Sequence, residues 1–376
     1  MKRRTFLRGG LAAGLLSAGG CSVPRTVAQA LNGNGHDDDP IKLMYNENPL
    51  GLCAAAKQAV IDGIVDANRY PDVPTAALVE AIAKKHSVDA SNIVMGNGST
   101  EALQMAVQVF GQEGTRFIQA VPTYEDVTRY AAPYNLEIVR LPLTSTYAHD
   151  IQRMKEEVAK SSGRTVIYFC QPNNPTGTIT PSKDIDDWIK SAGDDVCFLM
   201  DEAYYEYAEP DPEYHSALPW IETHPNVVVF RTFSKVYGMA GLRLGYAVAH
   251  PDTAAKLTEL QSVMNANHLA LMAGMASLED PNYLEVSVAT NTAARKILLG
   301  TLDDLGLEHL PSHTNFVMHK IRGDQDQYRA RMLEAGFMVG RNFPPMLEYS
   351  RLSLGTPGQM ERFVETLRDF RSKNWV

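Results

Sequence analysis

Four residues whose side chains can take part in catalysis or ligand binding lie close to apolar, β-branched runs of the sequence: Asn174, Asp201, Lys235 and Arg243. Such runs indicate buried strands of a parallel sheet, and the ligands of these sheets bind beyond the carboxyl ends of the strands. A carboxylate, an amine and a guanidinium buried together without a ligand would be strongly unfavourable. The pattern therefore predicts a site for a polar, charged small molecule at the strand ends.

A short turn near residue 98 has the composition of an anion-binding site. Gly98 and Ser99 lie between the predicted strand Ile93–Met95 and a predicted helix that begins at Thr100 and ends at Phe110. Backbone N–H groups and the positive end of a helix at such a turn favour a phosphate. A simple helix cap would have the same composition, so the turn gains meaning only together with the residues above.

Apolar runs and amphipathic segments alternate from residue 92 onward, which predicts a mainly parallel sheet with helices on both faces. The predicted strands are Ile93–Met95, Arg116–Gln119, Ile138–Leu141, Val166–Cys170, Val196–Met200, Val227–Phe230 and Leu244–Ala249. The predicted helices between them are Thr100–Phe110, Tyr124–Ala132, Ile151–Ser161 and Lys183–Ser191. The fold class is therefore α/β in three layers, with a second, smaller α+β domain.

The rest of the chain suits that second domain, since 376 residues exceed what a single core usually holds. Helical patterns cover Asp252–Leu278 and Tyr283–Leu305, and Asn315–His319 and Arg351–Leu354 are predicted strands. We expect Pro49–Ile64 to pack with this domain. The predicted division is an export signal (1–30), an N-terminal arm with part of the small domain (31–70), a large cofactor-binding domain (71–275) and a small C-terminal domain (276–376).

The first thirty residues are typical of an export signal, with a basic start, a short apolar stretch and a small-x-small cleavage site at Ala28-Gln29-Ala30. The pair Arg3-Arg4 followed by Phe6-Leu7 resembles the twin-arginine signal, which predicts a periplasmic protein. Ala18-Gly19-Gly20-Cys21 loosely resembles a lipoprotein box. Membrane attachment is expected only if Cys21 receives a lipid.

The charge and cysteine content exclude several other classes. With 35 Lys and Arg against 44 Asp and Glu the net charge is −9, and no basic cluster is suited to nucleic acid. Cys53, Cys170 and Cys197 are expected in the core, not in disulfides. His36–Asp39 lacks the spacing of a calcium loop and is predicted to be a solvated linker, so no metal site is expected.

Nine motifs in consistent order give the sequence a specific resemblance. The segments are Asn46–Gly51, Arg69–Asp72, Gly96–Glu101, Pro122–Tyr124, Asn173–Gly177, Asp201–Tyr204, Thr232–Lys235 with Gly241–Arg243, Asn315-Phe316 and Arg351–Ser353. Over residues 40–372 the chain resembles the fold-type I aminotransferases that use pyridoxal 5′-phosphate, nearest to the histidinol-phosphate aminotransferase branch. The resemblance implies transamination between an L-amino acid and a 2-oxo acid.

The resemblance also implies roles at the cofactor. Lys235 would bind the cofactor aldehyde and later act as general base, and Asp201 would pair with the pyridine nitrogen. Asn174 and Tyr204 would contact the 3-oxygen of the ring, and Tyr124 would stack on the ring. The phosphate would be held by Gly98, Ser99, Thr100, Thr232, Ser234 and Arg243. Tyr70 would reach the phosphate from the neighbouring subunit of a homodimer.

For the substrate, the resemblance implies that Arg351, supported by Asn315, clamps the α-carboxylate. Tyr45, Asn48 and Arg341 are further substrate-binding candidates. Histidinol-phosphate aminotransferases usually carry an arginine directly after the Val of a Gly-x-x-Val segment, where it helps to bind the substrate phosphate. Here Val339 is followed by Gly340, and only then by Arg341. This departure puts histidinol phosphate in doubt, and the apolar stretch Phe343–Met346 could shape a pocket for an aromatic or long side chain.

Two alternatives stay open at this point. Histidinol phosphate itself is one possible substrate, although an exported enzyme is an odd place for histidine biosynthesis. A lyase, decarboxylase or racemase would use the same Lys235 and Asp201 and would differ only in which bond at the α-carbon is broken. Formation of a 2-oxo acid together with stoichiometric amine transfer separates an aminotransferase from these enzymes.

Overall fold

The computed structural model describes residues 39–134 and 136–376. The predicted export signal, residues 1–30, and the candidate lipidation site Cys21 lie outside these residues. Within the described ranges, no helix combines the length and the apolar composition that crossing a bilayer requires.

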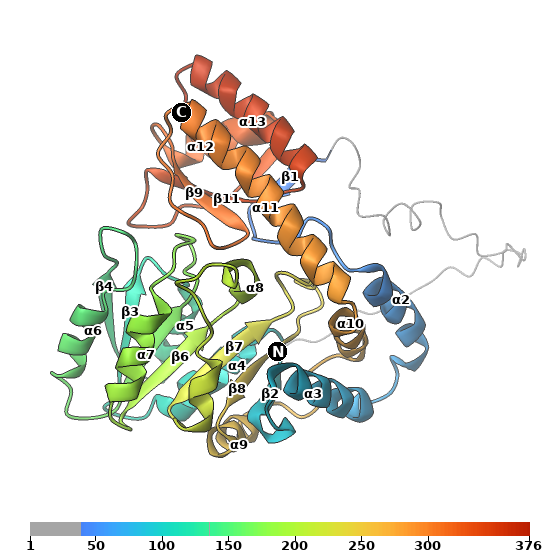
Figure 1. The fold of residues 1–376 in the computed structure, drawn as a ribbon, viewed down its shortest axis with the longest axis vertical. Coiled ribbons are helices and arrows are strands. Elements are labelled where there is room, and N and C mark those ends of the chain that lie inside the picture. Colours follow the sequence, from blue (N-terminus) through green and yellow to red (C-terminus); the bar gives the residue numbers. More distant parts are fainter. Residues whose placement is uncertain (1–38, 135) are drawn as a thin grey trace, which may run out of the picture. The chain divides into compact units, whose positions relative to one another are not determined.

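A seven-stranded sheet forms the centre of the larger domain, in the order β2-β8-β7-β6-β5-β3-β4 (Figure 1). Its strands are β2 (Ile93–Gly96), β3 (Arg116–Val121), β4 (Glu137–Pro142), β5 (Thr165–Cys170), β6 (Val196–Asp201), β7 (Val227–Thr232) and β8 (Gly245–Ala249). Strand β8 runs opposite to the other six, so its pairings with β2 and β7 are antiparallel. The prediction of a mainly parallel α/β sheet is confirmed, and each predicted strand lies within two residues of an observed one.

Alternate side chains of the strands pack into two separate cores, one on each face of the sheet. On β5, Ile167 and Phe169 join the first core, whereas Val166, Tyr168 and Cys170 join the second. Every residue of β5, β6 and β7 is buried, which explains why these strands read as continuous apolar runs.

Helices cover both faces of this sheet and complete the three layers (Figure 1). They are α3 (Asp72–His86), α4 (Ser99–Phe110), α5 (Asp126–Ala131), α6 (Ile151–Val158), α7 (Ser182–Ser191), α8 (Tyr205–Ala208), α9 (Pro251–Glu259) and α10 (His268–Leu278). Short 3₁₀ turns occupy Ile64–Asp66, Ala90–Asn92, Ala132–Tyr134 and Leu218–Glu222. Residues of α3, α7 and α10 belong to the first core, and residues of α4 and α9 to the second.

The smaller domain has its own apolar core and two short sheets. Strand β9 (Phe316–Lys320) pairs antiparallel with β11 (Tyr349–Ser353), and β1 (Ile41–Leu43) pairs parallel with β10 (Phe337–Val339). The helices α11 (Pro281–Asp304), α12 (Gln325–Glu334) and α13 (Pro357–Ser372) pack on these strands. The predicted strands Asn315–His319 and Arg351–Leu354 correspond to β9 and β11.

Two details differ from the sequence-based expectation. The helical pattern Asp252–Leu278 is two helices, because α9 ends at Glu259 and α10 begins at His268. Asn267 caps the second helix by accepting the N–H of Ala270 at 2.9 Å. In the loop between them, Gln261 and Asn265 donate to the carbonyl of Met95 at 2.7 and 3.0 Å, which ties the loop to β2.

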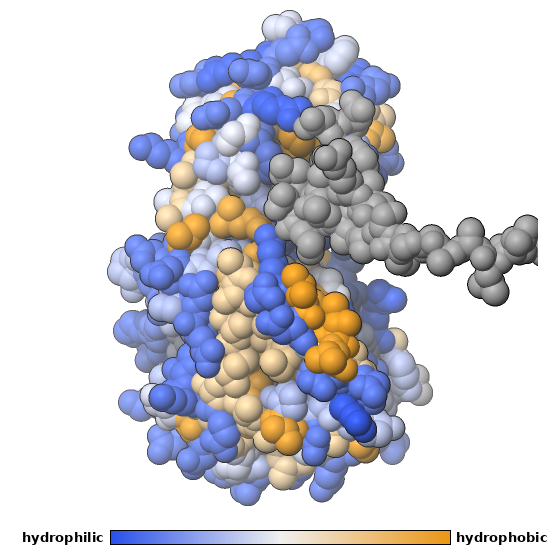
Figure 2. Space-filling view, turned by 90° about the vertical axis from the view of Figure 1, so that its right-hand side faces the viewer, coloured by the Kyte–Doolittle hydropathy of each residue, from blue (hydrophilic) through white to orange (hydrophobic). Residues whose placement is uncertain are grey.

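The second difference concerns the segment Pro49–Ile64, for which the sequence predicts packing with the smaller domain. Its helix α2 (Ala54–Gly63) instead packs against α10, and Cys53 and Ala56 belong to the first core of the larger domain. From the end of α2 to the start of α3, an apolar face is exposed (Figure 2), and we name it the α2–α3 face; its members are Ile61, Ile64, Val65, Tyr70 and Val73.

Candidate active site

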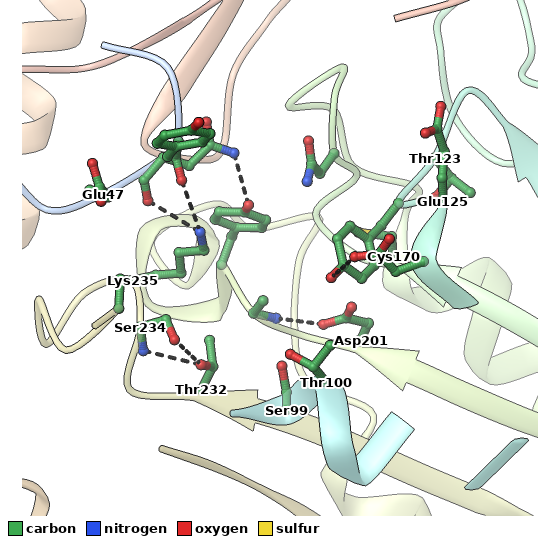
Figure 3. A pocket seen from close by; sticks show the side chains of 18 of the residues that line it. Glu47, Ser99, Thr100, Thr123, Glu125, Cys170, Asp201, Thr232, Ser234 and Lys235 are labelled. Atoms are coloured by element: carbon green, nitrogen blue, oxygen red, sulfur yellow. Dashed lines mark hydrogen bonds between the residues drawn. The ribbon is translucent and has the colours of Figure 1, made fainter. Parts of the chain in front are cut away.

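A cavity of about 670 Å³ lies at the carboxyl ends of β5, β6 and β7, between the larger and the smaller domain (Figure 3). Thirteen of the residues singled out from the sequence line it: Tyr45, Ser99, Thr100, Tyr124, Asn174, Asp201, Tyr204, Thr232, Ser234, Lys235, Arg243, Arg341 and Arg351. The strand ends thus bring together side chains that are up to 306 positions apart in the chain.

Asp201 is the last residue of β6 and presents a buried carboxylate to the cavity. Its Oδ2 accepts the hydroxyl of Tyr168 at 2.8 Å, and its Oδ1 accepts the backbone N–H of Ala203 at 3.2 Å. No basic side chain of the described residues lies within ion-pair distance. Burial therefore raises the pKa of Asp201 to about 6, against the opposing effect of the Tyr168 hydrogen bond. A buried carboxylate in this state is suited to a ligand that brings a positively charged N–H.

Lys235 lies three residues beyond the end of β7 and points across the cavity (Figure 3). Its Nζ donates to the backbone carbonyls of Asn46 and Tyr45 at 3.3 and 3.4 Å. Burial, and then the positive charge of Arg351, lower the pKa of Lys235 to about 8. No carboxylate of the described residues forms an ion pair with it. About a tenth of this amine is therefore neutral, and hence nucleophilic, at pH 7, far more than for a lysine with an ordinary pKa.

The turn at Gly98 forms a cradle for an anion. Gly98 has a φ of +76°, and a Cβ there would lie 2.5 Å from Nη2 of Arg243. Arg243 donates to the hydroxyls of Thr100 and Ser234 at 3.3 and 3.4 Å, and forms no ion pair with a carboxylate among the described residues. Its own φ of +59° is unusual for a residue with a side chain, and such strain is typical of functional sites.

Three more predicted residues surround the centre of the cavity. The hydroxyl of Thr232 donates to Ser234 at 3.0 Å, so both hydroxyls lie beside the cradle. Tyr124 donates to Asp126 at 2.7 Å, and burial together with this carboxylate raises its pKa. Tyr204 is buried, accepts the side-chain amide of Asn46 at 3.0 Å, and also has a raised pKa because of burial.

Arg351 reaches the cavity from β11 of the smaller domain. It donates to Oδ1 of Asn174 at 2.6 Å and to the carbonyl of Met44 at 2.8 Å. Its guanidinium packs over the ring of Phe343, 4.5 Å from the ring centroid, and its buried Nε lacks a hydrogen-bond partner in the described part of the chain. Burial lowers the pKa of this guanidinium to about 10. Arg351 lines the cavity and forms no ion pair with a carboxylate of the described residues, which suits an anionic ligand group.

Four predicted site residues do not line the cavity. The amide of Asn48 donates to Val236 O at 2.7 Å and to Ser287 Oγ at 3.0 Å, so it braces the backbone next to Lys235. Asn315 donates to the carbonyl of Asn46 at 2.9 Å, and Gly98 forms the turn behind Ser99. Tyr70 is 82% exposed, on the α2–α3 face.

Arg341 lies at the mouth of the cavity and forms an ion pair of 3.0 Å with Glu125. Both side chains are about half exposed, at 54% and 51%. The preceding residue, Gly340, has no space for a side chain, because a Cβ there would lie 2.5 Å from the carbonyl oxygen of Arg351. An arginine directly after Val339, which the resemblance noted from the sequence would lead one to expect, therefore could not be accommodated here without a shift of the β10–β11 contact.

Sequence reasoning missed several residues of the site. Asn46, with a φ of +56°, bonds to Tyr204 and to Ser353, and its carbonyl accepts Lys235 and Asn315. Asn46 and Ser353 belong to the motifs Asn46–Gly51 and Arg351–Ser353 named above. An asparagine or a serine by itself, however, does not indicate a functional role. Tyr168 on β5 and Glu125 at the mouth were missed as well, because a tyrosine inside an apolar strand and an acid before a helix are both ordinary.

Known proteins are similar to this chain over most of its length. The family model described as aminotransferase class I and II matches residues 38–367. A histidinol-phosphate aminotransferase of Caldicellulosiruptor saccharolyticus is 34% identical, over 88% of this chain and 91% of that protein. Another, histidinol-phosphate aminotransferase 1 of Thiobacillus denitrificans, is also 34% identical, over 88% of this chain and 85% of that protein.

Solved structures give the same result for the fold. A structure from Erwinia carotovora atroseptica, provisionally named a histidinol-phosphate aminotransferase, has a TM-score of 0.88 at 37% identity, covering 90% of this chain and 97% of that one. The histidinol-phosphate aminotransferase of Sinorhizobium meliloti in complex with pyridoxal 5′-phosphate has a TM-score of 0.82 at 23% identity, covering 95% and 99%. At that identity the second likeness is one of fold.

Proposed function

Since this chain belongs to the class I and II aminotransferases, which exchange amino groups with the cofactor pyridoxal 5′-phosphate, we propose that Lys235, Asp201 and Arg351 carry this reaction on an L-amino acid and a 2-oxo acid. One observation carries the proposal. Among the described residues, one cavity holds a buried carboxylate without an ion-pair partner, that of Asp201, and three cations without one, those of Lys235, Arg243 and Arg351. These charges suit a zwitterionic ring with a phosphate at one end and a carboxylate substrate at the other.

The chain's residues fit the cofactor. When bound, pyridoxal 5′-phosphate supplies an aldehyde that takes up the amino group and a ring that accepts electrons from the α-carbon. The phosphate would be held by the cradle around Gly98, where a side chain would collide with Arg243. Ser99 and Thr100 at the start of α4, together with Thr232 and Ser234, would supply N–H and hydroxyl donors.

The remaining contacts set the protonation of the ring and the position of the reacting carbon. Asp201 would hold a proton on the pyridine nitrogen, because its buried carboxylate gains a charge partner in this way. Tyr204 and Asn174 would contact the 3-oxygen, and Tyr124 would lie on the ring face. Lys235 would move the proton of the substrate α-carbon, since its lowered pKa allows it to accept and release a proton near neutral pH.

Arg351→Ala is expected to raise the KM for the amino acid by about 10- to 100-fold, because a charge-assisted pair with the α-carboxylate is lost. The effect on kcat is expected to be smaller. Steady-state kinetics with saturating cofactor measure both constants. Arg351→Lys is the matched control, because it keeps the positive charge but cannot bind a carboxylate in a bidentate manner. Its KM for the amino acid should lie between those of the wild type and the alanine variant. An unchanged KM in Arg351→Ala would remove this residue from the carboxylate site.

Arg243→Ala is expected to weaken cofactor binding by about 10- to 100-fold, since the guanidinium is the main positive charge at the cradle. Fluorescence titration of the cofactor-free protein with pyridoxal 5′-phosphate gives the dissociation constant. The phosphate-free analogue pyridoxal serves as a control ligand, because its affinity should not depend on Arg243. Equal losses for both ligands would argue against a phosphate contact.

The substrate that we favour is an amino acid without a distal phosphate. Gly340 leaves no arginine at the position that serves the substrate phosphate in the related branch, and Arg341 is engaged by Glu125 at the mouth. Relatives named histidinol-phosphate aminotransferases support the alternative, in which this chain acts on histidinol phosphate. In that case Arg341 would have to leave Glu125 to meet the phosphate.

A screen of amino donors tests the reaction and the substrate together. Purified protein with bound cofactor is mixed with single amino acids or with histidinol phosphate, and the cofactor absorbance and the 2-oxo product are followed. An aminotransferase produces one 2-oxo acid per amino group transferred to the cofactor. Release of carbon dioxide, or racemisation without a 2-oxo acid, would indicate a decarboxylase or a racemase that uses the same Lys235 and Asp201.

The active form that we propose is a homodimer in which Tyr70 contributes to the neighbouring site. Tyr70 is 82% exposed and lies on the α2–α3 face with other exposed apolar side chains, including Val65 at 78%. A soluble monomer rarely leaves such residues grouped at its surface. In a dimer this face would be covered, and the phenol of Tyr70 would be placed against the partner's phosphate cradle.

The compartment that we propose is the periplasm. The arginine pair Arg3-Arg4, the weakly apolar stretch after it and the site at Ala30 support export by the twin-arginine route. That route carries folded proteins, which suits an enzyme that folds around a cofactor made in the cytoplasm. Lipid attachment at Cys21 is the alternative processing, and the mass of the mature N-terminus distinguishes the two.

A further inference from the structure

Three hydrogen bonds connect the smaller domain to a tyrosine at the cavity. The backbone N–H of Asn46 donates to Oγ of Ser353 at 2.8 Å. The hydroxyl of Ser353 lies 3.0 Å from Oδ1 of Asn46, and Nδ2 of Asn46 lies 3.0 Å from the hydroxyl oxygen of Tyr204. All three residues are buried, at 3% exposure or less, so water does not compete strongly for these bonds.

The three bonds form a directed series that runs from the backbone of Asn46 through Ser353 and the side-chain amide of Asn46 to Tyr204. A backbone N–H can only donate, so Oγ of Ser353 must accept from Asn46. The proton of the Ser353 hydroxyl is then free for Oδ1, which orients the side-chain amide of Asn46. The opposite end of that amide is an NH₂ group, which can only donate, so the oxygen of Tyr204 must accept. With the amide in this orientation, Tyr204 is the acceptor of the third bond.

The consequence concerns the remaining proton of Tyr204. Because its oxygen accepts from Asn46, its own hydroxyl proton is available to another partner, and it has no acceptor among the described residues. Tyr204 lines the cavity, whose lining also includes Lys235 and Asp201. We propose that Ser353 and Asn46 are positioning residues that fix Tyr204 as a hydrogen-bond donor towards the ring oxygen of the bound cofactor. This inference rests on the proposed function.

The backbone of Asn46 is arranged to keep this orientation. Its φ of +56° is a conformation that asparagine tolerates better than most residues. Its carbonyl accepts Nδ2 of Asn315 at 2.9 Å and Nζ of Lys235 at 3.3 Å. Asn46 thus contacts both the phenol of Tyr204 and the amine of Lys235. Its own hydrogen bonds to Ser353 and Asn315 connect it to the smaller domain.

Asn46→Asp reverses the last bond, because a carboxylate has no proton to donate and Tyr204 must then donate to it. The readout is the pH at which the absorbance of the bound cofactor changes, which depends on how well the anionic ring oxygen is stabilised. Asn46→Asp is expected to raise this transition pH both in the otherwise wild-type protein and in the Tyr204→Phe variant. The rise should be larger in the otherwise wild-type protein, by at least about one pH unit. The phenylalanine background measures the direct effect of the added negative charge on Lys235.

Ser353→Ala tests the same relay without adding a charge. Loss of the hydroxyl frees the amide of Asn46 to turn, so the transition pH is expected to rise, and Ser353→Thr should restore it. This pair also decides the matter if Asn46→Asp does not fold or does not retain the cofactor. The inference is contradicted if Asn46→Asp shifts the transition equally in both backgrounds, or if Ser353→Ala titrates like Ser353→Thr. If the absorbance of the bound cofactor is the same in the wild type and in Lys235→Ala, the proposed function is contradicted instead.

Discussion

Lys235→Ala is expected to abolish amino transfer, lowering kcat by about 10⁴-fold or more, because the substitution removes both the amine that binds the cofactor aldehyde and the base that moves the α-proton. The structure favours this amine because it is half-buried, has a pKa near 8 and forms no ion pair with a carboxylate of the described residues. The measurement is single-turnover conversion of the bound cofactor with an amino donor found in the screen.

Lys235→Arg is the matched control for this experiment. It keeps a positive charge at the same place, but a guanidinium does not lose its proton near neutral pH and cannot serve as the base. Both variants should therefore be inactive, whereas thermal unfolding should show that both remain folded. Turnover in either variant at more than about a hundredth of the wild-type rate would assign the base to another residue.

Asp201→Asn is expected to lower kcat by about 10²- to 10³-fold, because a neutral amide does not hold a proton on the pyridine nitrogen as a carboxylate does. Steady-state kinetics at saturating substrate measure the loss, and Asp201→Glu, which keeps the charge, should lose less. The amide has almost the same shape as the carboxylate, so the site should keep its geometry. A kcat within about threefold of the wild type would mean that the ring nitrogen is not protonated by this residue.

The same substitution has a predicted effect on the stability of the cofactor-free protein. Burial raises the pKa of Asp201 from 3.8 to about 6, so the folded state holds this proton more tightly than the unfolded state. The wild type therefore loses stability relative to Asp201→Asn as the pH rises from about 4 to 6, by up to about 3 kcal/mol, and the two should converge below pH 4. Thermal unfolding across this pH range tests the sign. A gap that widens towards low pH would contradict it.

The central sheet could be predicted from the sequence because its strands are buried on both faces. Val166–Cys170 and Val196–Met200 are runs of apolar and aromatic residues that few other structures would tolerate, and β5 and β6 match them closely. Once the strands were placed, the rule that ligands bind beyond their carboxyl ends located Asn174, Asp201 and Lys235. These residues do come together in one cavity.

What could not be predicted depends on contacts that are distant in the sequence. The break between α9 and α10 follows from Gln261 and Asn265 bonding to Met95, far away in the chain. The pairing of β1 with β10 involves only three residues on each strand, too few for a period to show. The packing of α2 on the larger domain depends on α10, which the helical pattern alone does not orient.

In the site, too, some residues could be predicted from the local sequence and others depend on distant contacts. Residues with charged or amide side chains after strands could be singled out, whereas Ser353 and Asn46 act through a chain of bonds that joins positions 307 residues apart. The role of Gly340 depends on its distance to the backbone of Arg351, which no local pattern reveals. Asn48, a predicted substrate contact, is taken up by Val236 and Ser287, so its motif supports the loop beneath the cavity.

Reduction of the native protein with borohydride tests most directly whether the cofactor is joined to this cavity. After digestion, mass spectrometry should find one peptide carrying the reduced cofactor, with the modification on Lys235, and prior reaction with an amino donor should prevent the labelling. If Lys235 stays unmodified while the cofactor is removed by dialysis, or if another lysine carries the label, the assignment of this cavity as the cofactor site is contradicted.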